Sequence, residues 1–226
     1  MYQPPDRIRR EFDAIAPFSG DEWNHNNHYH GYLLSHVPTR IESALDIGCG
    51  TGEFARLIAA RAERVTGIDL SPEMIRIARE RSSDQPNITY QVADVLEWEL
   101  PTSSYDCIAS VATLHHMALD AVLPKLTRAL KPGGVLLVLD LYQSEGIGDL
   151  LRSALAILLH QYYARQHPRP AAKPEAERQA WDAHGSGDVY PRVSAVRRLA
   201  ATLLPGAQVR KHALWRYSLV WTKPVR

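Results

Sequence analysis

A short loop places three glycines at alternate positions between two carboxylates: Gly48, Gly50 and Gly52 between Asp46 and Glu53. Such glycines let the backbone turn sharply and approach a ligand without a Cβ in the way. A phosphate-binding loop would need Lys and then Ser or Thr after its last glycine, and a dinucleotide fingerprint needs the spacing G-x-G-x-x-G, so neither fits. Two carboxylates would repel a pyrophosphate but suit a ligand with positive charge. The loop predicts a site for a cationic nucleoside; the alternative is a strand-to-helix turn that binds no ligand.

Two further acids follow apolar, β-branched segments that read as strands. Asp69 ends the segment 64–69 and Asp94 follows the segment 88–92. A carboxylate at the end of a second strand can accept hydrogen bonds from both hydroxyls of a ribose. The alternative for Asp69 is a helix N-cap, but Ser71 before Pro72 is the better cap, which leaves Asp69 for the ribose. The alternative for Asp94 is a loop aspartate that bonds its own backbone.

Histidines gather at two places. His115 and His116 follow the segment 105–111, which reads as the fourth strand, and a neutral histidine there can take a proton near neutral pH. The alternative is that one ring packs and the other shapes a pocket. The stretch 23–30 holds three more histidines, for which a metal site, a surface or capping cluster and the rim of a site are the alternatives. Their spacing matches no known metal site, so no metal is expected.

These residues need a scaffold of alternating strands and helices. The helix 119–130 precedes a uniformly apolar segment, 135–139, which is typical of a strand covered on both faces. Residues 142–190 break the alternation with an amphipathic helix, 148–165, that is expected to pack over the carboxyl edge of the sheet. A helix capped by Ser194 and two paired strands, 207–212 and 215–222, complete the chain.

Several segments stand in an order that is typical of one family. They are Leu45-Asp46-Ile47-Gly48-Cys49-Gly50-Thr51-Gly52, Gly67-Ile68-Asp69-Leu70-Ser71, Ala93-Asp94-Val95, Leu114-His115-His116 and Leu130-Lys131-Pro132-Gly133-Gly134. The chain resembles the class I S-adenosylmethionine-dependent methyltransferases, most closely over residues 40–141. The resemblance implies an α/β fold with a Rossmann-like, seven-stranded, mostly parallel sheet, an antiparallel last strand, helices on both faces and a helical insertion after the fifth strand.

The resemblance also implies a cofactor, S-adenosyl-L-methionine, and a single domain over residues 1–226, with an N-terminal helical cap (1–43) and a lid (142–190). In such a fold Asp94 would accept from the adenine amino group while Val95 backs the ring. The expected cofactor contacts are Asp46, Gly48, Cys49, Gly50, Asp69, Leu70, Met74, Asp94, Val95 and Val111. The expected catalytic residues are His115 and His116, and the expected substrate contacts are Trp23, His28, Tyr29, His116 and Tyr142.

The composition of the chain limits which classes of partner are expected. The formal net charge of +1 gives no electrostatic reason to expect a nucleic-acid partner. Two cysteines, no signal-peptide pattern and no apolar run long enough for a membrane span favour a reduced, cytoplasmic protein, a monomer or a homodimer. The sequence thus predicts a methyltransferase acting on O, N or C of a small molecule; a protein or RNA methyltransferase and a non-catalytic cofactor-binding regulator are the alternatives.

Overall fold

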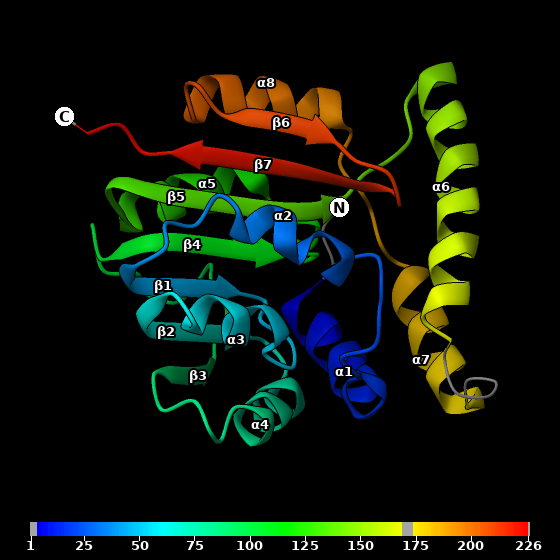
Figure 1. Cartoon of the computed structure of the whole chain (residues 1–226), viewed down its shortest axis with the longest axis horizontal. Helices are drawn as coiled ribbons and strands as arrows, with labels where there is room; N and C mark the ends of the chain where they lie inside the picture. Colours follow the sequence, from blue (N-terminus) through cyan, green and yellow to red (C-terminus); the bar gives the residue numbers. More distant parts are fainter. Residues whose placement is uncertain (1–3, 169–173, 226) are drawn as a thin grey trace.

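The computed structural model describes residues 4–168 and 174–225. Its centre is a seven-stranded sheet in the order β3-β2-β1-β4-β5-β7-β6, in which only β7 runs against its neighbours (Figure 1). The strands are β1 (Ile41–Ile47), β2 (Ala62–Asp69), β3 (Ile88–Val92), β4 (Tyr105–Val111), β5 (Leu130–Leu141), β6 (Gln208–Lys211) and β7 (Arg216–Thr222). The predicted fold class, including the antiparallel last strand, is confirmed.

Helices cover both faces of the sheet. One face packs on α2 (His30–Leu34), α3 (Glu53–Ala59) and α4 (Pro72–Arg81), and the other on α5 (Leu119–Ala129) and α8 (Val193–Leu203). Alternate residues of β5 enter the two cores, Leu137 one and Leu136 the other, which explains the uniformly apolar strand. The parallel strands end at one common edge, where ligands bind in open α/β sheets.

Two boundaries differ from the sequence prediction. The strand β5 begins at Leu130, so the segment 131–134 lies within it, paired to the chain end by bonds between Gly133 or Gly134 and Lys223. The helix α8 begins at Val193, and Ser194 lies inside it instead of capping it. The carboxylate of Glu145, far away in sequence, accepts from the backbone N–H and the hydroxyl of Ser194. Ser71 does cap α4, as predicted, by accepting from the N–H of Met74.

The N-terminal segment and the insertion lie beyond the carboxyl ends of the parallel strands (Figure 1). The first contains α1 (Pro5–Ile15) and the short helices η1 (Ala16–Phe18) and η2 (Asn27–Tyr29); the second contains α6 (Gly146–Gln166) and α7 (Glu175–Gly185). Helix α1 packs on both α4 and α7. Residues 1–3 of the expected cap and 169–173 of the expected lid lie outside the described residues.

Helix α6 corrects one prediction. This amphipathic helix was expected to pack over the carboxyl edge of the sheet, yet the side chains of Leu150 and Leu151 are 69% and 70% exposed. The residues of α6 that are buried are Asp149 and Ala156. The helix stands at the carboxyl edge as predicted, but with most of its apolar side chains in solvent, because it is tied down through a few small and polar residues. Among the described residues no helix is long and apolar enough to cross a membrane.

Candidate active site

The glycine loop joins β1 to α3, and its three glycines all have positive φ, at 64°, 52° and 80°. A side chain at Gly48 would collide with Thr113, and one at Gly52 would collide with Tyr90. A Cβ at Gly50 would meet no atom of the described residues within 4 Å. Two of the glycines are therefore required by packing, whereas the third borders open space that a ligand can use.

Asp69 holds this loop in place. Its Oδ2 accepts from the backbone N–H of Gly50 at 2.9 Å, and its Oδ1 accepts from the N–H of Ser71 at 2.9 Å. The prediction that Asp69 is free for a ribose is thus wrong in one respect, since both oxygens already have a backbone partner. Each carboxylate oxygen has a second lone pair, however, and Asp69 borders the cavity described below. One carboxylate can therefore order the loop and still accept from a ligand.

Asp46, the last but one residue of β1, is buried, and its Oδ2 has no hydrogen-bond partner in the part of the chain that the structure describes. Burial, followed by the nearby charge of Asp69, raises the pKa of Asp46 to about 7, although a backbone bond from Ala55 opposes this. A buried, unpartnered carboxylate oxygen is costly unless a ligand satisfies it. A cationic ligand beside the loop would do so, which fits the sulfonium and ammonium groups of S-adenosylmethionine.

A cavity of about 1220 Å³ opens from the loop along the carboxyl ends of β1, β2 and β4. It is lined by all the residues expected to contact the cofactor: Asp46, Gly48, Cys49, Gly50, Asp69, Leu70, Met74, Asp94, Val95 and Val111. Asp94 also makes the local bond considered as its alternative, since its Oδ1 accepts from the N–H of Leu96 at 2.8 Å. Burial raises the pKa of the Cys49 thiol well above its ordinary value, so that residue stays neutral.

Of the expected substrate contacts, Trp23 and His116 line the cavity, whereas His28, Tyr29 and Tyr142 lie outside its lining. His28 accepts from the indole N–H of Trp23 at 3.4 Å, so it supports a lining residue. Tyr29 donates to the backbone oxygen of Ala213 at 2.6 Å. Tyr142 is part of the apolar core. Aromatic character alone does not distinguish residues that line the cavity from residues that pack behind its lining.

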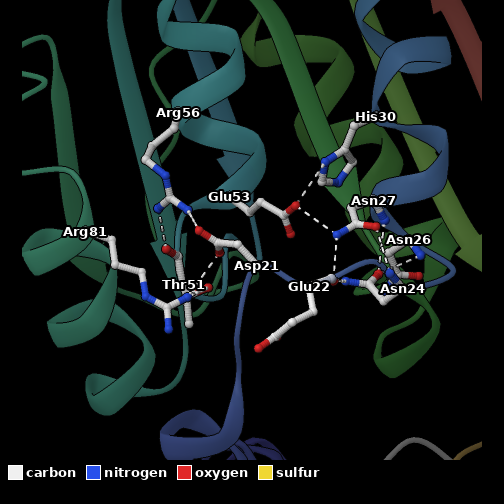
Figure 2. Close-up of polar contacts among 10 residues, drawn as sticks. All are labelled: Asp21, Glu22, Asn24, Asn26, Asn27, His30, Thr51, Glu53, Arg56 and Arg81. Carbon is white, nitrogen blue, oxygen red and sulfur yellow. Dashed lines mark hydrogen bonds and ion pairs between the residues drawn. The ribbon is translucent and has the colours of Figure 1, made fainter. Parts of the chain in front are cut away.

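The N-terminal segment is bonded to the loop side of the cavity by a polar network (Figure 2). Asp21 accepts from Arg56 at 3.0 Å and from Arg81 at 3.1 Å, so it bridges α3 and α4. Asn27 donates to Glu53, the first residue of α3, at 3.0 Å. These contacts join residues far apart in the chain, so no local sequence pattern predicts them.

The two predicted catalytic histidines form the short helix η3 (Leu114–His116) directly after β4. Nδ1 of His115 lies 2.6 Å from Oδ1 of Asp140, near the end of β5, and Oδ2 of Asp140 accepts from the His115 backbone N–H at 2.9 Å. Burial opposes a charge on His115, but Asp140 and Asp188 outweigh it and raise its pKa to about 9. Burial, reinforced by the charge of His115, lowers the pKa of His116 to about 4.

Sequence reasoning missed Asp140 and Asp188. Asp140 is the last but one residue of an apolar strand and Asp69 the last residue of another, so a similar signal could have found Asp140. Asp188 lies just after α7, with its carboxylate facing His115 at 3.8 Å and His116 at 3.6 Å. Three neighbouring imidazoles offset the effect of burial and lower the pKa of Asp188. Nothing in the sequence of the insertion points to this placement.

Known proteins resemble the chain in both sequence and fold. A family model described as a methyltransferase domain matches residues 44–134. An uncharacterized methyltransferase of Mycobacterium tuberculosis is 30% identical over 207 residues, which are 90% of this chain and 98% of that protein. The 27-O-demethylrifamycin SV methyltransferase of Amycolatopsis mediterranei is 32% identical over 161 residues, 60% of this chain and 58% of its own.

The fold is similar to that of phosphoethanolamine N-methyltransferase 2 of Haemonchus contortus, solved in complex with S-adenosyl-L-methionine. The TM-score is 0.67 and the sequence identity is 18%. The match covers 95% of this chain and 57% of that one. The near full-length relative, the glycine loop and the buried acid beside it agree on one family and one cofactor. The chain belongs to the class I S-adenosylmethionine-dependent methyltransferases.

Proposed function

We propose that the protein transfers a methyl group to a small-molecule acceptor held in the same cavity as the cofactor. The observation that carries this proposal is the continuity of the cavity, which runs from the glycine loop to His115 and His116 without a break. Its volume of about 1220 Å³ exceeds the roughly 300–1,000 Å³ of ordinary small-molecule pockets, so two ligands have room. The rifamycin methyltransferase relative acts on a small molecule, which supports the same class of acceptor here.

The cavity divides into two ends by chemistry. Asp46, Asp69 and Asp94 place carboxylates along the end that would hold the cofactor, where hydroxyl, amino and sulfonium groups need acceptors or negative charge. The other end is bordered by His115 and His116, together with parts of α1 and α7, and Trp23 also lines the cavity. Rings with polar tips on an apolar wall are the usual lining of a small-molecule site, so this end would hold the acceptor.

When bound, S-adenosylmethionine supplies an electrophilic methyl group on its sulfonium. The task left to the chain is mainly positioning, which can be worth roughly 7–11 kcal/mol of the barrier. Asp140 fixes the ring of His115 through a bond of 2.6 Å, and His115 in turn lies beside His116 with ring centroids 3.9 Å apart. We propose that the two histidines border the acceptor and help to orient it, with the His115 ring held by Asp140.

Residues 1–43 and 142–190 would act as a cap and a lid on one domain. Phe12 of α1 packs edge-on against His116 and His184, at centroid distances of 5.8 and 4.6 Å. Asp188 and Tyr190 of the insertion lie next to His115. Both segments therefore wall the acceptor end, where exclusion of water from the sulfonium favours transfer over side reactions.

The acceptor can be sought by mass. The protein is incubated with S-adenosylmethionine and an extract of small metabolites, and the products are resolved by mass spectrometry. The proposal expects S-adenosylhomocysteine to accumulate together with a low-mass product that has gained one CH₂ unit. Cofactor binding without any turnover in such extracts would instead support a regulator that binds the cofactor.

A further inference from the structure

Among the described residues, one group of side chains has the make-up of a metal site: His115, His116 and Asp188, whose candidate ligand atoms all lie within 4.8 Å of one another. Nε2 of His115 is 3.8 Å from Oδ2 of Asp188, and Nδ1 of His116 is 3.6 Å from Oδ1. Both distances are too long for hydrogen bonds. Ligand atoms about 2.0–2.1 Å from a tetrahedral metal are about 3.4 Å apart, so the two distances to Asp188 need to shorten by about 0.2–0.4 Å to seat a cation.

The surroundings of His115 match those of a metal ligand. Its Nδ1 is engaged with buried Asp140 at 2.6 Å, which leaves Nε2 as the nitrogen directed at Asp188. Histidines that bind metals almost always give their other ring nitrogen to a carboxylate, a carbonyl or water. The backbone N–H of His115 also donates to Asp140, so the ring and its main chain are held by one carboxylate.

Asp188 is oriented just as closely. Its Oδ2 accepts from the Tyr190 hydroxyl at 3.1 Å and lies 3.4 Å from Nε2 of His184. The other nitrogen of His184 is 3.0 Å from Oε2 of Glu11, on α1. Ligating carboxylates are commonly hydrogen-bonded in this manner. A chain of contacts thus ties Asp188 to α1 while its second oxygen faces His116.

The alternative is that His115, His116 and Asp188 form only a structural network of ion pairs, but this leaves one buried nitrogen of His116 unexplained. His116 is 8% exposed, and its Nε2 has no hydrogen-bond partner among the described residues. A buried polar nitrogen without a partner is unusual in a purely structural cluster. Nδ1, the nitrogen that faces Asp188 at 3.6 Å, would be the ligand. Because Nε2 has no bond among the described residues, it does not hold the ring away from coordination through Nδ1.

We propose that His115, His116 and Asp188 bind a divalent transition-metal cation, with Zn²⁺ as the first candidate. Two imidazoles and one carboxylate suit such metals and leave a coordination position open, whereas Mg²⁺ and Ca²⁺ prefer oxygen ligands. The three side chains border the cavity, so the open position faces the acceptor end. Its use by an oxygen or nitrogen of the acceptor rests on the proposed function, whereas metal binding itself does not.

The test is a titration of the metal-free protein with Co²⁺, followed by its visible absorption, and with Zn²⁺ in a calorimeter. One equivalent should bind to the wild type and give the absorption of a nitrogen- and oxygen-ligated Co²⁺. His116→Gln and Asp188→Asn should each weaken binding by at least about tenfold, the usual minimum even for residues around the ligands. Mg²⁺ should not compete.

The matched control uses another histidine pair of the chain. Nε2 of His25 lies 2.9 Å from Nδ1 of His160 on α6, and His160→Gln removes that pair. This variant should bind Co²⁺ as the wild type does. Loss of binding in His160→Gln with retention in His116→Gln, or no stoichiometric binding in the wild type, would overturn the proposal.

Two further readouts keep the result interpretable. Binding of S-adenosylhomocysteine, measured on every variant, shows whether the fold and the cofactor end are intact and separates failure of the metal site from failure of the proposed function. X-ray absorption at the zinc edge of the wild-type protein needs no variant. It should show imidazole scattering and nitrogen or oxygen neighbours at about 2.0–2.1 Å. A sulfur shell, or a fully hydrated ion without imidazole, would contradict the assignment.

Discussion

Oδ2 of Asp69 accepts a hydrogen bond of 2.9 Å from the backbone N–H of Gly50, so the acid at the end of β2 shapes the loop at the end of β1. Its other oxygen accepts from Ser71, the cap of α4. A residue expected only to bind ribose thus also holds two neighbouring segments of the cofactor site. This double role changes what its removal should do.

Asp69→Ala should lower both stability and cofactor affinity. The loss leaves two backbone N–H groups without partners, at about 1–3 kcal/mol each if they stay buried, and removes the proposed ribose acceptor. We expect a lower melting temperature and at least tenfold weaker S-adenosylhomocysteine binding by calorimetry. Asp94→Ala is the comparison, because Asp94 accepts only one local bond and should lower affinity with less effect on melting. Near-normal affinity of Asp69→Ala for S-adenosylhomocysteine would show that Asp69 does not contact the cofactor.

Gly50→Ala should reduce cofactor affinity in addition to the stability that any side chain costs at this position. The new Cβ meets no protein atom within 4 Å, but it enters the space beside the loop. Gly206→Ala is a matched control, since Gly206 also has positive φ and open surroundings but lies outside the cavity. Both variants should lose about 1–2 kcal/mol of stability from the left-handed backbone. Only Gly50→Ala should reduce the thermal shift given by S-adenosylhomocysteine; equal shifts in the two would contradict this.

Asp46→Asn should stabilise the ligand-free protein and lower its affinity for the cofactor. The pKa of Asp46 rises from 3.8 to about 7 on folding, so the folded state binds its proton more tightly than the unfolded state does. Wild-type stability therefore falls as pH rises from 3.8 through about 7, and Asn removes that loss. At pH about 8 the ligand-free variant should be more stable by at least about 1 kcal/mol in urea unfolding.

The same shift makes cofactor affinity depend on pH. A cationic ligand should bind the ionised form of Asp46 better than the neutral form, so wild-type affinity should increase from pH about 5.5 to about 7 and then level off. Asp46→Asn should bind more weakly and without this rise. Calorimetry over that range is the measurement, and a parallel pH dependence in the variant would assign the rise to another group.

The exposed face of α6 should contribute little to stability. Leu150→Ser and Leu151→Ser remove side chains that are 69% and 70% exposed, so unfolding free energies should change by no more than about 0.5 kcal/mol. Ala156→Glu, at a position 1% exposed, should be strongly destabilising. A loss above about 1 kcal/mol in a leucine variant would mean that this face is covered in solution.

The sheet and its ligand edge could be predicted from the sequence because strand, loop and helix signals there are local. Ser71 before Pro72 marks a helix start by its own chemistry, and that start was correct. Ser194 was also expected to cap a helix, yet it lies inside α8 and its backbone N–H donates to Glu145 from another part of the chain. The placement of Asp188 against His116 likewise depends on how the insertion folds back, which no local pattern encodes. Residues that line the cavity through long-range packing could not be found in this way.

The central claim is that the protein transfers a methyl group to a small molecule, and following that methyl group tests it most directly. The protein is incubated in a cell extract with S-adenosylmethionine labelled in its methyl group, and the label is then followed into protein, RNA and a filtrate of small molecules. The account predicts label in the filtrate, with little when Gly50→Ala replaces the wild type. Label that stays with protein or RNA and is absent from the filtrate would contradict it.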